Sequence, residues 1–329
     1  MKRFTNVNPG TLTQALAAAD DARRSGRAVA IAGGGTDLLQ LMRERIVTPD
    51  VLINLKTIGS AKALVASASG TRIGGLATLA SVAADEGVRQ KYAVLAEAAE
   101  SVATPQIRNV GTLAGNVCQR PWCWYYRNGF KCFKNGGNVC YSAAGENEFH
   151  AIFGGGPSYI VHPSDTAVAL VALGATFVLN TSHGERTVAA HDFFALPTAN
   201  PAVENVLADG EVLSDIHLPP AKPGTRSHYM KVLDRETWTH AVVSAAVTLR
   251  LEGGVCRESS VVLGGVAPVP WALPEVNALL VGKRITADVA AQAGALAVAN
   301  ARPMTHNRYK VGLTRTTVTR ALLETASRT

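Results

Sequence analysis

Apolar residues recur at helical spacing in several segments of this chain, and short apolar runs between those segments indicate strands. The first half of the chain alternates between the two patterns. Its predicted helices cover residues 12–24, 38–43, 78–88, 92–101 and 166–173. Its predicted strands cover residues 28–32, 51–55, 71–76, 175–180 and 186–190, the last two forming a hairpin about a Ser-His-Gly turn.

A different order follows the Pro- and Gly-rich stretch 219–224, which has the composition of a linker. Strands come first, predicted over residues 228–233, 241–251 and 256–263. Helices come after them, predicted over residues 271–281, 285–299 and 310–327. Strands followed by helices are typical of an α+β lobe, so the pattern predicts two domains of mixed helix and sheet.

The composition argues against some classes of function but does not identify one. The chain has 329 residues, of which 47% are hydrophobic and 17% charged, and its net charge is +7. The positive charges are scattered rather than arranged along one helix, so we expect no nucleic-acid partner. No apolar run is long enough to span a bilayer, and no signal-peptide core follows Met1, so we expect no membrane insertion and a cytoplasmic location.

Four of the five cysteines fall in one short basic segment, GNVCQRPWCWYYRNGFKCFKNGGNVC. They are Cys118, Cys123, Cys132 and Cys140, separated by four, eight and seven residues. Thiols that ligate a metal must be ionised, and nearby cations favour the thiolate. The segment therefore suggests an iron–sulfur cluster.

Two other readings of this segment remain open. Zinc modules usually pair their cysteines at closer spacing and often include histidine, and no histidine lies between Cys118 and Cys140. Structural thiols or a disulfide suit a secreted chain better than this one.

Two glycine-rich loops stand between apolar segments. The first is Gly33–Asp37, between a predicted strand and helix, and the second is Gly111–Asn116. Neither is a Rossmann or a Walker motif. Each combines small residues with a threonine, so together they can hold a dinucleotide pyrophosphate from two sides. Asp165 is a candidate for binding ribose or ribityl hydroxyls, or else for capping the helix that follows it.

In that order along the chain, AGGGTDLL, TRIGGLAT, QIRNVGTLAGN, HPSDTAVAL, YMKVLDR and GGVAPVPW resemble the FAD-binding (medium) subunit of molybdenum hydroxylases, the xanthine dehydrogenase family. The cysteine segment, with RPWCWYYRNG and GENEFHAIFGGG, is similar to the flavin subunit of bacterial aldehyde oxidoreductases and to its counterpart in hydroxybenzoyl-CoA reductase. In both relatives that segment carries a [4Fe-4S] cluster.

The resemblance implies an α+β fold with a two-lobed FAD-binding domain of the PCMH type. That domain would cover residues 1–222, with lobes at about 1–56 and 57–222 and an iron–sulfur insertion at about 117–158. A smaller C-terminal domain of antiparallel strands and helices would cover residues 223–329.

The implied function is electron transfer within a complex. A molybdopterin-binding large subunit would oxidise the substrate, and a small subunit would carry [2Fe-2S] clusters. Electrons would reach FAD on this chain and pass to an external acceptor. The chain offers no molybdopterin pocket and no plant-type ferredoxin spacing of its own, and a folded complex carried by a partner's signal could be exported to the periplasm.

The resemblance also assigns roles to individual residues. Those expected to bind FAD are Ile31, Ala32, Gly33, Gly34, Gly35, Thr36, Asp37, Leu38, Gly111, Thr112, Gly115, Asn116, Ser164, Asp165, Leu213 and Lys231. Leu213 and Lys231 would approach the isoalloxazine ring. The alternative for Lys231 is a surface lysine on a strand.

One position departs from the family pattern. Relatives that hold the cluster are expected to have a cysteine where this chain has Ser158. Either Cys118 supplies the fourth thiolate, or Ser158 ligates through oxygen, or the cluster is incomplete. Of these, Cys118 is the expected fourth ligand, because oxygen is a harder donor than iron–sulfur sites usually take.

Two other function classes compete with this one. A self-sufficient FAD oxidase would have its own substrate pocket. A zinc-stabilised binding module would carry no flavin. The histidines His150, His162 and His240 are expected to be structural rather than general bases.

Overall fold

The computed structural model describes residues 1–235 and 239–328. Its N-terminal part is a three-stranded parallel sheet in the order β1-β3-β2, with β1 at Thr5–Val7, β2 at Val29–Ala32 and β3 at Val51–Asn54. The helices α1 (Leu12–Arg24) and α2 (Leu38–Arg43) connect these strands. Thr11 caps α1, whose buried face is made of alanines and Leu16, so both helices have the bounds that the pattern predicts.

The middle of the chain builds a five-stranded sheet in the order β4-β5-β8-β6-β7. Its strands are β4 (Leu64–Ser67), β5 (Gly70–Gly74), β6 (Thr176–Thr181), β7 (Gly184–Ala189) and β8 (Val212–Leu218). The helices of this part are α3 (Leu79–Ala84), α4 (Glu86–Lys91), α5 (Ala93–Glu100), α6 (Pro105–Arg108), α7 (Leu113–Val117), α8 (Trp124–Arg127), α9 (Asp165–Ala172) and α10 (Ala190–Phe193). Short 3₁₀ turns lie at Leu55–Thr57, Gly59–Lys62, Phe133–Asn135 and Tyr141–Ala143.

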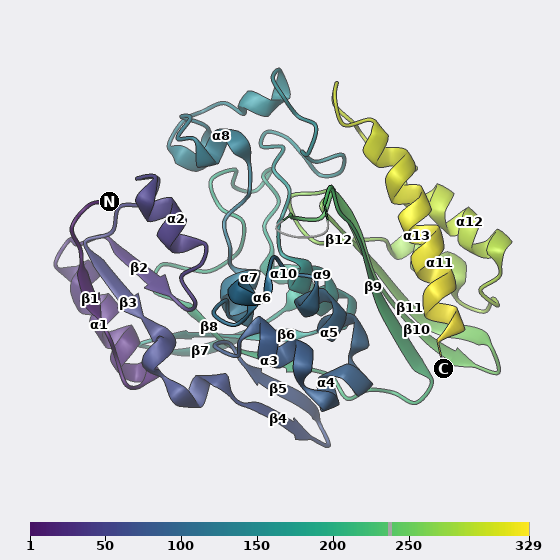
Figure 1. Cartoon of the computed structure of the whole chain (residues 1–329), viewed down its shortest axis with the longest axis horizontal. Helices are drawn as coiled ribbons and strands as arrows, with labels where there is room; N and C mark the ends of the chain where they lie inside the picture. Colours follow the sequence, from purple (N-terminus) through teal and green to yellow (C-terminus); the bar gives the residue numbers. More distant parts are fainter. Residues whose placement is uncertain (236–238, 329) are drawn as a thin grey trace.

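The C-terminal part is an antiparallel sheet in the order β12-β11-β10-β9. Its strands are β9 (Thr225–Val232), β10 (Val243–Glu252), β11 (Val255–Gly264) and β12 (Trp271–Ala272). The helices α11 (Pro274–Leu280), α12 (Ala287–Ala297) and α13 (Tyr309–Ser327) follow, and α13 packs on β9 and β10 (Figure 1). The predicted order of strands and then helices is confirmed.

Helices α5 and α9 join the two larger sheets. α5 contacts β9, and α9 contacts β10 and β11, so both helices lie between the middle and the C-terminal parts in Figure 1. The core around them is rich in alanine, valine and leucine from α3, α5, α7 and α9. The predicted domain limits fall near this junction, since β8 ends at Leu218 and β9 begins at Thr225.

Three local predictions need correction. The helix predicted over 78–88 is interrupted at Asp85, whose side chain accepts a hydrogen bond from the Val88 amide and so caps α4 separately. The helix predicted from residue 271 begins at Pro274, and Trp271 belongs to β12. Strand β8 was not predicted, although it lies between β5 and β6 in the sheet.

The cysteine-bearing segment has little regular structure. It contains α8 and two 3₁₀ turns, and Figure 1 shows it above α2 and the central helices. Among the described residues, no helix is both long and apolar enough to cross a membrane.

Candidate functional site

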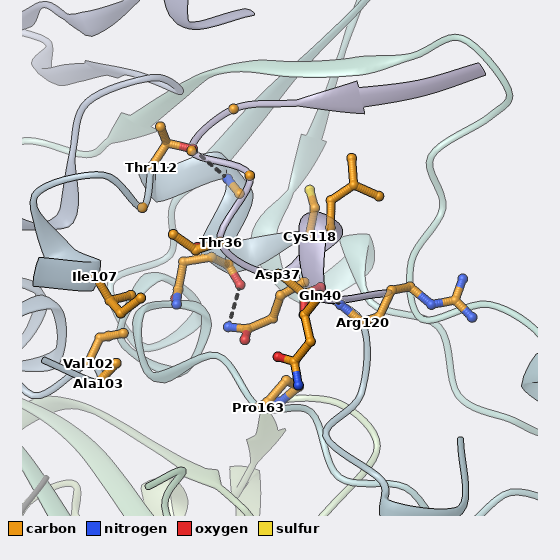
Figure 2. Close-up of a pocket in the computed structure, with 18 of the residues that line it drawn as sticks. Thr36, Asp37, Gln40, Val102, Ala103, Ile107, Thr112, Cys118, Arg120 and Pro163 are labelled. Atoms are coloured by element: carbon orange, nitrogen blue, oxygen red, sulfur yellow. Dashed lines mark hydrogen bonds between the residues drawn. The ribbon is translucent and has the colours of Figure 1, made fainter. Parts of the chain in front are cut away.

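The two glycine-rich loops and the start of α9 enclose a cavity of about 360 Å³. Figure 2 shows Thr36, Asp37, Thr112 and Cys118 around it. Most of the predicted cofactor residues line it: Ile31, Ala32, Gly33, Gly34, Gly35, Thr36, Asp37, Leu38, Gly111, Thr112, Gly115, Asn116 and Asp165. The structure therefore brings together residues that lie more than a hundred positions apart in the sequence.

Glycine is required where the two loops touch. A Cβ on Gly34 would lie 2.2 Å from the Val110 carbonyl oxygen, and one on Gly33 would lie 2.5 Å from Thr112 Oγ1. Gly35 has φ +75°, in the left-handed region that favours glycine. Side chains at these positions would separate the loops, so the glycines keep two stretches of backbone close to anything bound in the cavity.

The second loop is tied to the start of α9. Thr112 Oγ1 accepts a hydrogen bond from the Gly115 amide at 3.1 Å, which begins the short helix α7. Asn116 Oδ1 accepts hydrogen bonds from Ser164 Oγ and Thr166 Oγ1, both at 2.6 Å. The loop Gly111–Asn116 and the start of α9 are thus joined by hydrogen bonds into one unit.

Asp165 and Lys231 form a buried ion pair. Lys231 Nζ lies 2.7 Å from Asp165 Oδ2, and Tyr229 Oη donates to Asp165 Oδ1 at 2.6 Å. Burial and the adjacent Asp165 carboxylate raise the pKa of Tyr229, so its hydroxyl remains a donor. The Lys231 side chain is only 4% exposed, so the surface alternative for Lys231 is wrong.

The capping alternative for Asp165 is also wrong. Ser164 occupies the N-cap of α9, and its hydroxyl accepts from the Ala167 amide at 3.0 Å. Asp165 stands in the first helical turn, where a negative charge is favourable.

A second cavity of about 670 Å³ adjoins the first. Both are lined by Gln40, Trp122, Pro163, Asp165, Thr239 and His240, and the second is lined by Ser164 as well. Burial lowers the pKa of His240, so its imidazole is neutral, and its ring lies 5.2 Å from that of Trp122. Leu213 and Lys231 line neither cavity.

Several lining residues carry no sequence signal. Those of the first cavity that were not predicted are Gln40, Leu41, Val47, Leu79, Val102, Ala103, Ile107, Gln119, Arg120, Trp122, Pro163, Thr239 and His240. They come from separate elements and belong to no single motif. A nearby signal exists for Ile107 in QIRNVGTLAGN, for Arg120 and Trp122 in RPWCWYYRNG, and for Pro163 in the HPSD motif.

The structure separates Cys118 from the other cysteines of its segment. Cys118 ends α7, lines the first cavity and packs against the central core. Burial raises its pKa to about 12, so its sulfur is a neutral thiol.

Cys123 and Cys132 instead pack beside Leu41 of α2 and Tyr126 of α8. Burial, with smaller contributions from the neighbouring Cys140 and Cys132, raises the pKa of Cys123 to about 11. Cys123 Sγ lies 3.4 Å from His150 Nε2, and the Tyr159 amide donates to Cys140 Sγ at 3.4 Å. Ser158, the residue before Tyr159, is buried.

All five cysteines are free thiols. In the described part of the chain, no three Cys, His, Asp or Glu side chains converge closely enough to hold a metal ion. Three thiols of the segment thus lie in one region, but they are not close enough together to coordinate a metal ion.

A cavity walled by two glycine loops and the start of a helix defines a dinucleotide-binding protein. Residues 2–221 match the family described as FAD binding domain in molybdopterin dehydrogenase, and residues 228–325 match the CO dehydrogenase flavoprotein C-terminal domain. The chain belongs to this family of FAD-binding subunits, and it is an FAD-dependent oxidoreductase subunit. The resemblance that the motifs carry is confirmed at this level.

Comparison with individual proteins leads to the same family. The aldehyde oxidoreductase FAD-binding subunit PaoB of Escherichia coli K12 is 36% identical, over 98% of each chain. The carbon monoxide dehydrogenase medium chain of Afipia carboxidovorans is 26% identical over 84% of this chain and 80% of its own length. A solved carbon monoxide dehydrogenase from Hydrogenophaga pseudoflava superposes with a TM-score of 0.77 at 25% identity, covering 98% of this chain and 97% of that one. The expected fold is therefore confirmed.

Proposed function

We propose that this chain is the electron-transfer subunit of a multi-subunit molybdenum-containing hydroxylase that oxidises aldehydes. A molybdopterin-binding large subunit would carry the substrate chemistry, and a small subunit would carry [2Fe-2S] clusters. The observation that carries the proposal is the contact between the two glycine loops along one cavity. The full-length similarity to an aldehyde oxidoreductase subunit supports the choice of substrate class.

The residues present fit FAD. The backbone of Gly34 approaches that of Val110 and Gly111 with no side chain between them, and the Thr112 hydroxyl lies next to Gly33, so backbone and hydroxyl groups can surround a pyrophosphate. Thr36 and Thr112 supply hydroxyls at the same cavity. When bound, FAD would take up electrons from the partner's centres and release them to an external acceptor.

The two cavities divide the cofactor between them in this proposal. The first would hold the pyrophosphate and ribityl chain, and the second would hold the isoalloxazine ring beside Trp122 and His240. Asp165 lines both, and its carboxylate is held by Lys231 and Tyr229. Lys231 would thus act on the cofactor through Asp165, and Leu213 would support β8 from the core.

We also propose the domain limits that the motifs suggest. The FAD-binding domain covers residues 1–222, in lobes 1–56 and 57–222, with the cysteine insertion at 117–158. The C-terminal domain covers residues 223–329. The family matches at 2–221 and 228–325 support the boundary between the domains.

We further propose a [4Fe-4S] cluster in the insertion, with Cys123, Cys132 and Cys140 as three of its ligands. Their support is the packing of Cys123 and Cys132 in one cluster, the contact of the Tyr159 amide with Cys140 Sγ, and the basic residues of the segment. The fourth ligand would lie at or near Ser158, because the amide of the next residue, Tyr159, contacts Cys140. It would not be Cys118, which lines the flavin cavity. Cluster assembly would require the three thiols to move closer together.

Two measurements test these proposals. The complex copurified with its partners should contain FAD and show flavin reduction when an aldehyde is added, while the isolated chain should not react with the aldehyde. A colourless complex without flavin would refute the function, and aldehyde turnover by the isolated chain would favour a self-sufficient oxidase.

Iron and sulfide analysis tests the cluster. Cys123→Ser should lose iron, whereas Cys118→Ser should retain it, because Cys118 lies in the other cavity. Equal iron loss in both variants would restore Cys118 as a ligand, and zinc in place of iron would favour a zinc module.

A further inference from the structure

A buried arginine of the cysteine insertion forms an ion pair with the flavin loop. Arg127, the last residue of α8, places Nη2 2.7 Å from Asp37 Oδ1. The same guanidinium donates to the Arg120 carbonyl at 2.8 Å and to the Pro121 carbonyl at 2.9 Å. The Arg127 side chain is 9% exposed and that of Asp37 is 24% exposed, so water screens this ion pair only in part.

Both carboxylate oxygens of Asp37 are engaged by the insertion. Oδ1 accepts from Arg127, and Oδ2 accepts from the Arg120 amide at 3.0 Å. Asp37 stands at the N-cap position of α2 but makes no capping hydrogen bond with its side chain. Its carboxylate therefore serves the contact with the insertion rather than its own helix, directly after Gly33–Gly35.

Ring contacts reinforce this connection. The Arg127 guanidinium carbon lies 4.7 Å from the centre of the Trp122 ring, and Trp122 lines both cavities. Tyr126, beside Arg127, packs on Leu41 of α2 together with Cys132 and Cys123. The thiols, the arginine and the helix that follows the flavin loop thus belong to one packed unit.

The other buried ion pair of the insertion leads elsewhere. Lys134 Nζ lies 2.6 Å from Glu204 Oε1, and Arg120 Nε lies 3.1 Å from Glu204 Oε2. Glu204 lines neither cavity. Glu204 therefore pairs with the insertion away from the cavity lining, whereas the side chain of Arg127 pairs with Asp37 in the flavin loop.

We propose that Arg127 is a positioning residue for FAD: through Asp37 it holds the loop Gly33–Asp37 in its binding shape, so flavin affinity depends on the cysteine insertion. The inference rests on FAD binding at the two glycine loops. Without Arg127, the Asp37 carboxylate loses its buried cation, and the loop relaxes toward water.

The test is the dissociation constant of FAD, measured from the quenching of flavin fluorescence on the full-length chain. Arg127→Gln and Asp37→Asn should each raise this constant about tenfold, since each removes one member of the charged pair that holds the loop. If Arg127 acts through Asp37, the double variant should be no weaker than the weaker single variant. Such non-additivity is expected when two residues act through one contact.

Arg186→Gln is the matched control. Arg186 also makes two hydrogen bonds to one carboxylate, that of Glu211, at 2.6 and 2.7 Å, but it lines neither cavity. The dissociation constant of FAD for the Arg186→Gln variant should equal that for the wild type. Unchanged affinity in a folded Arg127→Gln variant would overturn the inference.

Two further outcomes are separable. If Arg127→Gln does not fold, as judged by circular dichroism, Asp37→Asn and Arg127→Lys carry the test, and unchanged affinity in both would refute the proposal. If the wild-type chain itself binds no FAD, the proposed function fails and the inference fails with it.

Discussion

Asp165 Oδ2 and Lys231 Nζ lie 2.7 Å apart, in a buried contact between the start of α9 and strand β9. The two residues are separated by 66 positions and come from the middle and the C-terminal parts of the chain. Lys231 also donates to the Ser101 carbonyl at 3.0 Å. The pair therefore fixes the C-terminal sheet against the cavity wall.

Lys231→Met should destabilise the protein by about 3–5 kcal/mol, because it leaves the Asp165 carboxylate buried without its cation. Lys222→Met is the control, since Lys222 also lies 2.7 Å from a carboxylate, that of Glu258, but its side chain is 61% exposed. The control should change stability by less than about 1 kcal/mol. Urea unfolding of both variants measures the difference, and equal losses would contradict the assigned role of burial.

Gly34→Ala should weaken FAD binding about 10- to 100-fold. The new Cβ would lie 2.2 Å from the Val110 carbonyl oxygen, so one loop must move, at a cost of about 1–3 kcal/mol. Gly59→Ala is the control, because a Cβ there meets no atom within 4 Å. Titration with FAD measures both, and equal affinities would show that the loops tolerate separation.

The two loops were predictable from the sequence because glycines, a threonine and flanking apolar runs are local signals. The same holds for α1, where Thr11, the apolar spacing and the two arginines in the last turn mark both ends. Gln40, Trp122 and His240 were not predictable, because only the packing of α2, the insertion and the C-terminal part brings them to one cavity. The sequence does not predict strand β8 for a similar reason, since its partners β5 and β6 lie far apart in the sequence.

Asp165 and Lys231 show the limit most clearly. The motifs point to both residues, but they predict a separate contact with the cofactor for each. Their pairing depends on the approach of α9 to β9, and no spacing in the sequence encodes it. The burial of Lys231 followed from the same approach.

Cys118 should resist alkylation up to high pH. Burial raises its pKa from about 9 to about 12, so the folded protein keeps the reactive thiolate scarce at pH 8. Between pH 9 and 12 the unfolded chain releases this proton and the folded chain does not, so this group lowers stability as pH rises. Mass spectrometry after iodoacetamide treatment at pH 8 should find Cys118 unmodified when folded and modified in urea. Rapid modification of the folded chain at pH 8 would contradict the raised pKa of this thiol.

Lys310→Met should loosen the end of the cysteine insertion. Lys310 is buried on α13, and its Nζ donates to the carbonyls of Phe149, His150 and Gly265 at 2.8, 3.2 and 2.7 Å. Methionine fills similar space but removes the donor of the Phe149 and Gly265 carbonyls, while Asn307 Nδ2 still donates to the His150 carbonyl at 3.1 Å, so we expect a loss of about 2 kcal/mol or more. Lys91→Met, at the exposed end of α4, should leave stability within about 0.5 kcal/mol of the wild type.

Proteolysis shows where the Lys310→Met variant loosens. Because two of the three acceptors belong to residues 149–150, cleavage within 117–158 should accelerate more than cleavage elsewhere. His150 contacts Cys123, so the loosening should extend to the thiols, and Cys123 should be alkylated faster than in the Lys91→Met control. A uniform rise in cleavage along the whole chain would instead mean that Lys310 supports the fold in general. In that case the C-terminal helix would have no special hold on the insertion.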